Sequence, residues 1–281
     1  MKNTHSNLES FTNIRGLIID MDGVLWHGNQ PLAGLNEFFD LLREKKIPFI
    51  LATNNSTLTQ TEYVTKLRKM KVEVKNNEVL TSSMVTALYL AKHYPPQENK
   101  LFMIGEAGLK EALLAQGYYL KGVDETADAD VVVCGLDRQL EWKQLATATL
   151  TIRAGAKFIA TNGDTTLPTE KGLVPGNGSI IEALKTATGG ISAQTLGKPE
   201  PLMYQDALSL LKTEAAETIT IGDRLDTDIL GSVRAGIRSV MVLTGISSEN
   251  DIQHVGYQPT WIMDDIKVLT QALANLTSHN P

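Results

Sequence analysis

The stretch "LIIDMDGVLWHG", residues 17–28, decides the predicted fold. Three apolar residues run into Asp20 and Asp22, which one methionine separates, and then into Gly23. Residues i and i+2 of a strand share a face about 6–7 Å apart, and glycine lets the backbone turn at once. One aspartate at such a place is usually a turn or helix cap, but two carboxylates side by side favour a bound cation. We therefore predict a buried strand over 17–20 that ends in two acids addressing one pocket.

The same pattern repeats along the whole chain. Short apolar runs that end in Gly, Asn, Asp or Thr alternate with amphipathic segments of helical length, which is typical of βα units and a parallel sheet. The clearest further strand candidates are 48–53, 100–104, 129–134, 157–161, 218–221 and 239–243, and the clearest helix candidates are 34–44, 59–70, 109–115, 142–153, 179–188, 201–211 and 227–235. We expect an α/β protein with a doubly wound parallel sheet. The length of 281 residues fits one large domain or two of ordinary size.

Composition narrows the classes of partner. With 42% hydrophobic and 21% charged residues the chain reads as an ordinary globular protein. A net charge of −6 without clustered basic residues argues against nucleic-acid or anionic membrane partners. The single cysteine cannot form an internal disulfide, and the first dozen residues lack the apolar core of a signal peptide. We expect a cytoplasmic protein with no membrane partner.

A second acidic cluster follows another strand candidate. In "TITIGDRLDTDI", residues 218–229, Asp223 follows an apolar run and a glycine, with Asp226 and Asp228 close behind. Together with the first pair of carboxylates, they would form an all-oxygen site suited to Mg²⁺. No His/Cys spacing points to zinc. For Asp226, capping of the following helix is the preferred interpretation.

Two further stretches could meet a phosphate. "ILATNNST" ends a strand with a hydroxyl and two amides, Thr53, Asn54 and Asn55, and a helix candidate begins close behind. Such side chains and the N–H groups of the turn would form a neutral anion cradle, although turns are rich in these residues anyway. Lys198, in "LGKPEP", precedes a helix candidate. Most lysines are solvated, but an acidic metal site that holds phosphate needs a compensating cation.

Taken in order, Asp-x-Asp, Thr, Lys and Gly-Asp…Asp, the sequence resembles the haloacid dehalogenase superfamily of phosphatases. More narrowly, it is similar to subfamily IIA, which includes NagD and the p-nitrophenyl phosphatase-like enzymes. The resemblance covers nearly the whole chain, and the four motifs in the right order are jointly specific. The matching stretches are DMDGVLWHG (20–28), LATNNS (51–56), LTSS (80–83), CGLDRQ (134–139), FIATNGD (158–164), the Pro- and Gly-rich 168–178, GKPEP (197–201) and GDRLDTDI (222–229).

The resemblance implies a role for each motif residue. Asp20 would be the nucleophile and Asp22 the general acid and base. Thr53 and Lys198 would hold the phosphoryl group, and the Asn54–Asn55 pair would line the same phosphate site.

The resemblance also implies a magnesium site. Asp223 would complete it with the carboxylate of Asp20 and the backbone carbonyl of Asp22. Asp228 would be an outer partner of this site. The implied cofactor is Mg²⁺.

The family further implies two domains. Residues 1–83 and 193–281 would form the Rossmann-like catalytic core, and residues 84–192 an inserted α/β cap of the larger, C2 type. "FIATNGDTT", 158–166, echoes the earlier "FILATNNST", and the residues alone leave open whether this is a repeat or chance. The resemblance assigns the echo to the cap.

Cap residues would set the specificity for substrate. Asp137 and Asn162 follow cap strand candidates and could face the leaving group, although both also fit plain turn chemistry. Relatives often dimerise through the cap, so a homodimer is possible.

We therefore expect a Mg²⁺-dependent phosphatase that acts on small phosphomonoesters, such as sugar phosphates, nucleotides or phosphoglycolate, through an aspartyl-phosphate. One alternative is a phospho-accepting regulatory switch domain, which needs only about half this length. Another is a catalytically silent ligand-binding relative, although every catalytic position is occupied. Dehalogenation is a third, and Asp22 argues against it because a halide needs no proton to leave.

Overall fold

The computed structural model describes residues 12–123, 128–169 and 171–275. Within these residues the chain divides into two compact units. The first unit comprises 12–53, 64–80 and 198–275, and the second comprises 54–63 and 81–197 without the gaps at 124–127 and 170. The assignment of the second unit as a cap over a catalytic core stays a prediction.

The first unit is built on a six-stranded sheet. Its order is β14 (Trp261–Met263), β13 (Arg238–Val242), β12 (Thr218–Gly222), β1 (Gly16–Ile19), β4 (Phe49–Thr53) and β5 (Val79–Thr81). The pairs from β14 to β4 are all parallel. Every residue of β1, β4 and β12 is buried, as expected for a parallel sheet covered on both faces.

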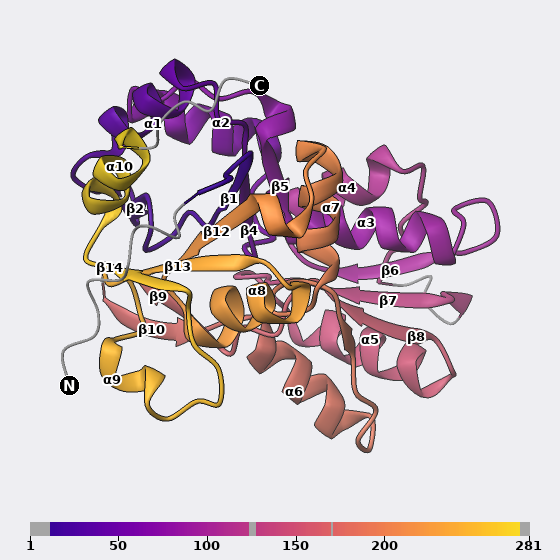
Figure 1. Cartoon of the computed structure of the whole chain (residues 1–281). Helices are drawn as coiled ribbons and strands as arrows, with labels where there is room; N and C mark the ends of the chain where they lie inside the picture. Colours follow the sequence, from indigo (N-terminus) through magenta and orange to yellow (C-terminus); the bar gives the residue numbers. More distant parts are fainter. Residues whose placement is uncertain (1–11, 124–127, 170, 276–281) are drawn as a thin grey trace. The chain divides into compact units, whose positions relative to one another are not determined.

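Helices cover both faces of this sheet. In Figure 1, α1 (Leu35–Glu44) and α10 (Ile266–Ala274) lie together on one side, and α8 (Leu230–Ala235) lies on the other. The helix α1 buries Leu35, Phe38, Phe39 and Leu42, whose spacing of three and four residues produces one apolar stripe. This unit also contains α7 (Leu202–Leu211) and α9 (Glu249–Ile252), and a short antiparallel pair joins β2 (Trp26–His27) to β3 (Gln30–Pro31). The helix α2 (Gln60–Lys69) has residues 64–69 in the first unit and residues 60–63 in the second.

The second unit has its own sheet and core. Four parallel strands lie in the order β11 (Gln194–Thr195), β8 (Lys157–Ala160), β7 (Val131–Cys134) and β6 (Leu101–Ile104). Figure 1 shows α3 (Ser82–His93) and α4 (Ala107–Ala115) on one side of this sheet, with α5 (Trp142–Arg153) and α6 (Asn177–Ala187) on the other. An antiparallel pair, β9 (Thr166–Thr169) and β10 (Gly172–Pro175), completes the unit.

The predicted α/β class with parallel sheets is confirmed. One helix differs from its prediction. The candidate 227–235 is a turn of π-helix, Leu225–Ile229, followed by the short α8. Extra residues of this kind in a helix often occur at functional sites, and this one follows the second acidic motif. Within the described residues, every helix is too short or too polar to cross a bilayer.

Candidate active site

Three neighbouring strands bring their carboxyl ends to one edge of the first sheet. Asp20 directly follows β1, Asp223 directly follows β12, and Thr53 is the last residue of β4. The backbone N–H of Asp20 donates to the carbonyl of Ile221 at 2.8 Å, which fixes β1 against β12 at this point. Open parallel sheets bind ligands at the carboxyl ends of their strands, so this edge is the expected place for a site.

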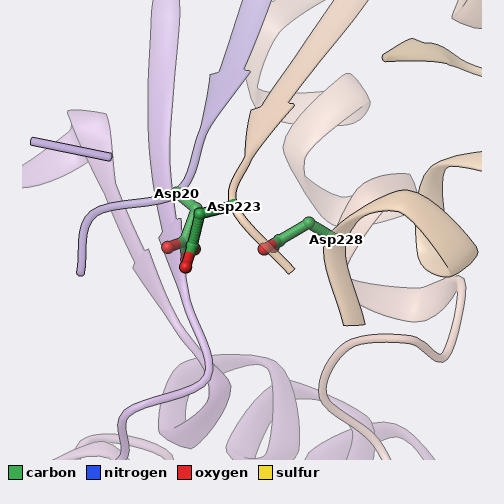
Figure 2. Close-up of side chains that lie close together, drawn as sticks. All are labelled: Asp20, Asp223 and Asp228. Carbon is green, nitrogen blue, oxygen red and sulfur yellow. The ribbon is translucent and has the colours of Figure 1, made fainter. Parts of the chain in front are cut away.

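Three carboxylates converge at this edge. Asp20, Asp223 and Asp228 each have an oxygen within 4.8 Å of the others, and Figure 2 shows the carboxylates of Asp20 and Asp223 beside each other with that of Asp228 directed toward them. Asp223 and Asp228 are 1% and 4% exposed. Like charges this close and this buried repel each other strongly, so the cluster needs positive charge.

Lys198 supplies one positive charge. Its Nζ lies 2.5 Å from Asp20 Oδ1 and 2.6 Å from Asp228 Oδ1, and it donates to the carbonyl of Ala52 at 3.1 Å. The three acceptors match the three donors of an ammonium group, which explains how Lys198 can be 3% exposed. Burial alone lowers the pKa of Lys198, but the two carboxylates outweigh it and hold that pKa well above its ordinary value.

One lysine does not neutralise the whole cluster. Burial raises the pKa of Asp20 well above its ordinary value, Lys198 opposes this, and Asp228 and Asp223 add to it. Burial, followed by the charge of Asp228, raises the pKa of Asp223 to about 7, although the N–H of Ile246 opposes the shift. These directions mean that negative charge is in excess here. A further cation would relieve that excess.

Asp223 also has an oxygen that no described group satisfies. Its Oδ2 accepts from the backbone N–H of Ile246 at 2.9 Å, whereas its buried Oδ1 has no hydrogen-bond partner among the described residues. Two glycines make room beside this carboxylate. Gly23 has φ +87°, and a Cβ at Gly23 or at Gly245 would overlap with the Asp223 side chain. A buried, unsatisfied carboxylate oxygen in an all-oxygen donor set fits a hard cation such as Mg²⁺.

The Asp22 side chain has a different partner. Its Oδ1 accepts from the indole Nε1–H of Trp26 at 2.7 Å, and it is not a member of the three-carboxylate cluster. The structure thus brings together Asp20, Asp223 and Lys198, with Asp228, and ties Asp22 to the loop that follows β1.

The predicted phosphate cradle divides between the two units. Thr53 belongs to the first unit and is 3% exposed. The residue before it in the chain, Ala52, accepts a hydrogen bond from Lys198 through its carbonyl. In the second unit, Asn54 Nδ2 lies 3.2 Å from both carboxylate oxygens of Asp164. Asn55 Oδ1 accepts from the backbone N–H and the hydroxyl of Thr57. The phosphate-binding roles of these three residues stay predictions.

Both predicted specificity residues make turn contacts within the second unit. Asp137 Oδ1 accepts from the backbone N–H of Gln139 at 2.9 Å. Asn162 is 3% exposed, donates to the carbonyl of Asn54 at 2.7 Å and accepts from the N–H of Asp164. The Asp137–Gln139 and Asn162–Asp164 contacts are the turn chemistry that the sequence also allowed, whereas the bond to Asn54 ties Asn162 to a segment 108 residues earlier. A role toward substrate stays a prediction for both.

Sequence reasoning misjudged Asp226 and missed Tyr204. The carboxylate of Asp226 is exposed and pairs with the Arg224 guanidinium at 2.8 Å instead of capping a helix, because the chain there forms the π-turn and α8 begins only after Ile229. The Tyr204 hydroxyl donates to the carbonyl of Asp228 at 3.0 Å and so supports that turn from α7. Nothing in the local pattern of α7 signals this contact.

Comparisons with known proteins identify the family of this chain. Residues 17–119 match the profile described as haloacid dehalogenase-like hydrolase, and residues 195–269 match a second, HAD-hydrolase-like profile. An acid sugar phosphatase of Staphylococcus aureus is 38% identical over 262 residues, which are 93% of this chain and 98% of that protein. The chain belongs to the haloacid dehalogenase-like hydrolases.

Solved structures of this hydrolase family place the chain among phosphatases. A 4-nitrophenylphosphatase from Thermotoga maritima has a TM-score of 0.87 at 32% identity, covering 95% of this chain and all of that one. A glycerol phosphate phosphatase from Mycobacterium tuberculosis, solved in complex with magnesium, has a TM-score of 0.84 at 35% identity and covers 94% of this chain and 77% of that one. The predicted resemblance to the haloacid dehalogenase family is therefore confirmed.

Proposed function

We propose that this chain is a Mg²⁺-dependent phosphatase that hydrolyses small phosphomonoesters through a phosphorylated Asp20. The carrying observation is the meeting of Asp20, Lys198 and two further carboxylates at the carboxyl edge of the sheet. The names of the relatives, acid sugar phosphatase, 4-nitrophenylphosphatase and glycerol phosphate phosphatase, support phosphate esters of small alcohols as the substrate class.

The residues present fit a magnesium ion. Asp20 and Asp223 would hold it with their carboxylates and Asp22 with its backbone carbonyl, and the unsatisfied oxygen of Asp223 supports this assignment. When bound, the ion supplies positive charge to the phosphate and to the surrounding carboxylates. Asp228 would stay an outer partner because Lys198 and the backbone N–H of Arg224 already donate to its two oxygens.

The chain's own groups account for the two half-reactions. A carboxylate oxygen of Asp20 attacks phosphorus in line, and the P–O bond to the leaving alcohol breaks as the Asp22 carboxyl gives that oxygen a proton. Lys198 neutralises the phosphoryl group, because phosphoryl transfer depends mainly on positioning and charge. The Asp22 carboxylate then takes a proton from the water that attacks the phosphorylated Asp20. Inorganic phosphate and free Asp20 result.

Turnover separates this proposal from its alternatives. A phospho-accepting switch domain would take up one phosphate per chain, and a silent relative would take up none, whereas a phosphatase releases many. The test is phosphate release from a panel of sugar phosphates, glycerol phosphate, nucleotides and p-nitrophenyl phosphate, with Mg²⁺ and with excess chelator.

We expect many turnovers on at least one ester, lost in chelator and lost in Asp20→Asn. The matched control is Asp226→Asn, which removes an exposed carboxylate from the same acidic loop outside the cluster and should leave turnover within about twofold. Full activity in excess chelator would count against the metal, and full activity in Asp20→Asn against the nucleophile.

A further inference from the structure

Trp26 is fully buried, and a tryptophan in such a place usually contributes only to hydrophobic packing. It is 0% exposed, so it cannot touch a substrate. Yet its one polar atom, Nε1, donates to Asp22 Oδ1 at 2.7 Å, at the short end of the range for such bonds. The contact therefore links a residue outside the reaction to the side chain proposed as its proton carrier.

The loop between these two residues is closed by its own backbone. The N–H of Gly23 donates to the carbonyl of Trp26 at 2.9 Å, and the N–H of Leu25 donates to the carbonyl of Met21 at 2.8 Å. Gly23 has φ +87°, which glycine adopts without strain. The tight turn places the indole of Trp26 beside a carboxylate only four residues earlier, so the geometry does not depend on a flexible segment.

A cation lies against the same ring. Lys66 Nζ sits 4.2 Å from the centroid of the Trp26 ring, and the Asp22 charge acts on its pKa against the effect of burial. An ammonium over an indole face draws electron density from the ring and strengthens its N–H as a donor. Lys66 thus lies over the face of the Trp26 ring, and the N–H at the edge of the same ring donates to Asp22.

An N–H donor distinguishes the two oxygens of a carboxylic acid. Protonated Asp22 has one hydroxyl oxygen and one carbonyl oxygen, and the carbonyl oxygen is the better acceptor of an N–H. An N–H held at Oδ1 therefore favours the acid proton on Oδ2.

We propose that Trp26 is a positioning residue that fixes the rotamer of Asp22 and confines its transferable proton to Oδ2. This inference rests on the proposed function, because it gives Asp22 the proton that the leaving alcohol receives. The residue acts through Asp22 and contacts neither substrate nor metal.

The test compares two leaving groups in Trp26→Phe, which keeps an aromatic ring and removes the N–H. An alkyl phosphate such as glycerol phosphate needs a proton on its leaving oxygen, whereas 2,4-dinitrophenyl phosphate does not. The ratio kcat/KM covers the steps up to the first irreversible one, the departure of the alcohol. We expect kcat/KM for the alkyl ester to fall at least about tenfold, part of the 10²–10⁴ that general acid catalysis contributes, and to stay within about twofold for the dinitrophenyl ester.

The matched control is Trp261→Phe, the same substitution at a buried tryptophan of β14 that packs against Arg238. It should change kcat/KM for both esters by the same factor. An equal loss on both esters in Trp26→Phe would reduce Trp26 to a packing residue and overturn the proposal. If Trp26→Phe does not fold, benzothienylalanine at position 26 keeps the ring shape and replaces N–H by sulfur, with the same two outcomes.

A readout without turnover separates this inference from the proposed function. In protein labelled with ¹⁵N-tryptophan, the Nε1–H of Trp26 should resonate downfield and move upfield in Asp22→Ala. An unchanged resonance would refute the contact whether or not the enzyme turns over. If the Trp26 resonance moves in Asp22→Ala but the wild-type protein turns over none of the esters, the Trp26–Asp22 contact is confirmed and the assignment of Asp22 to proton transfer is overturned.

Discussion

Asp20 has two physical roles that a single substitution can separate. Its carboxylate is both the proposed nucleophile and an ion-pair partner of Lys198 at 2.5 Å. In Asp20→Asn the amide oxygen can still accept from Lys198, but the neutral amide is too poor a nucleophile to form the acyl phosphate. We expect phosphate release at background and an unchanged far-ultraviolet circular dichroism spectrum. More than trace phosphatase activity in this variant would refute the nucleophile assignment.

Lys198 should matter for stability as well as for activity. In Lys198→Met, Asp20 and Asp228 lose the ammonium group that bridges them and remain almost as buried. Removing one partner of a buried ion pair costs about 3–5 kcal/mol, because the remaining charge is uncompensated. We expect the free energy of unfolding in urea, measured with chelator, to fall by about that amount. An unchanged midpoint and slope would mean that water already screens the cluster.

At the scale of elements, the loop after β13 should control the metal site through Gly245. A Cβ there would overlap with the Asp223 carboxylate and push it out of its place. We expect Gly245→Ala to weaken Mg²⁺ binding by about 10–100-fold, the usual cost of disturbing the support of a ligand. Isothermal titration with Mg²⁺ measures this.

The control for that loop is Gly256→Ala, an exposed glycine with nothing within 4 Å of its added Cβ. Its Mg²⁺ affinity should match the wild type. Equal affinities in Gly245→Ala and the wild type would remove Asp223 from the proposed ligand set.

The π-turn is the element that local patterns did not predict. Residues 227–235 carry helical periodicity, and the sequence therefore favoured one continuous helix with Asp226 as its cap. The structure instead has a π-helical turn at Leu225–Ile229. Its Asp228 carbonyl accepts from the hydroxyl of Tyr204 at 3.0 Å and from that of Ser232 at 2.6 Å. The contact from Tyr204 on α7 supports this turn, and a local helical pattern does not encode it.

At the scale of the whole molecule, Mg²⁺ should stabilise the fold. A ligand that binds only the native state adds about 2.7 kcal/mol at a concentration of 100 Kd. We expect the thermal midpoint of the wild type to rise by several degrees with Mg²⁺, and the rise to disappear in Asp223→Asn. A rise of equal size in Asp223→Asn would place the stabilising ion elsewhere.

The domain roles and the assembly stay predictions at this scale. The described residues form two units, each with its own parallel sheet and core. The cap function, the specificity roles of Asp137 and Asn162, the homodimer and the cytoplasmic location stay predictions. Sedimentation of the purified chain would measure the mass of the assembly directly.

By itself, the sequence determined the α/β class, the positions of most strands and helices, and the acids and lysine that end up in the cluster. The alternation of apolar and amphipathic segments indicates which residues are buried in strands and helices. The short motifs around Asp20, Thr53, Lys198 and Asp223 follow one another in the order that is typical of the family. These signals are local, so no long-range contact is needed to read them.

Only the tertiary structure decided which of these groups touch. Lys198 meets Asp20 across 178 residues of chain, and Trp26 turns its N–H toward Asp22 although its neighbours in sequence mark it only as apolar. Distances of this kind depend on strand register and on buried charges that must find partners. The sequence pattern does not encode these contacts, because they form only when segments far apart in the chain pack together and bury their polar groups.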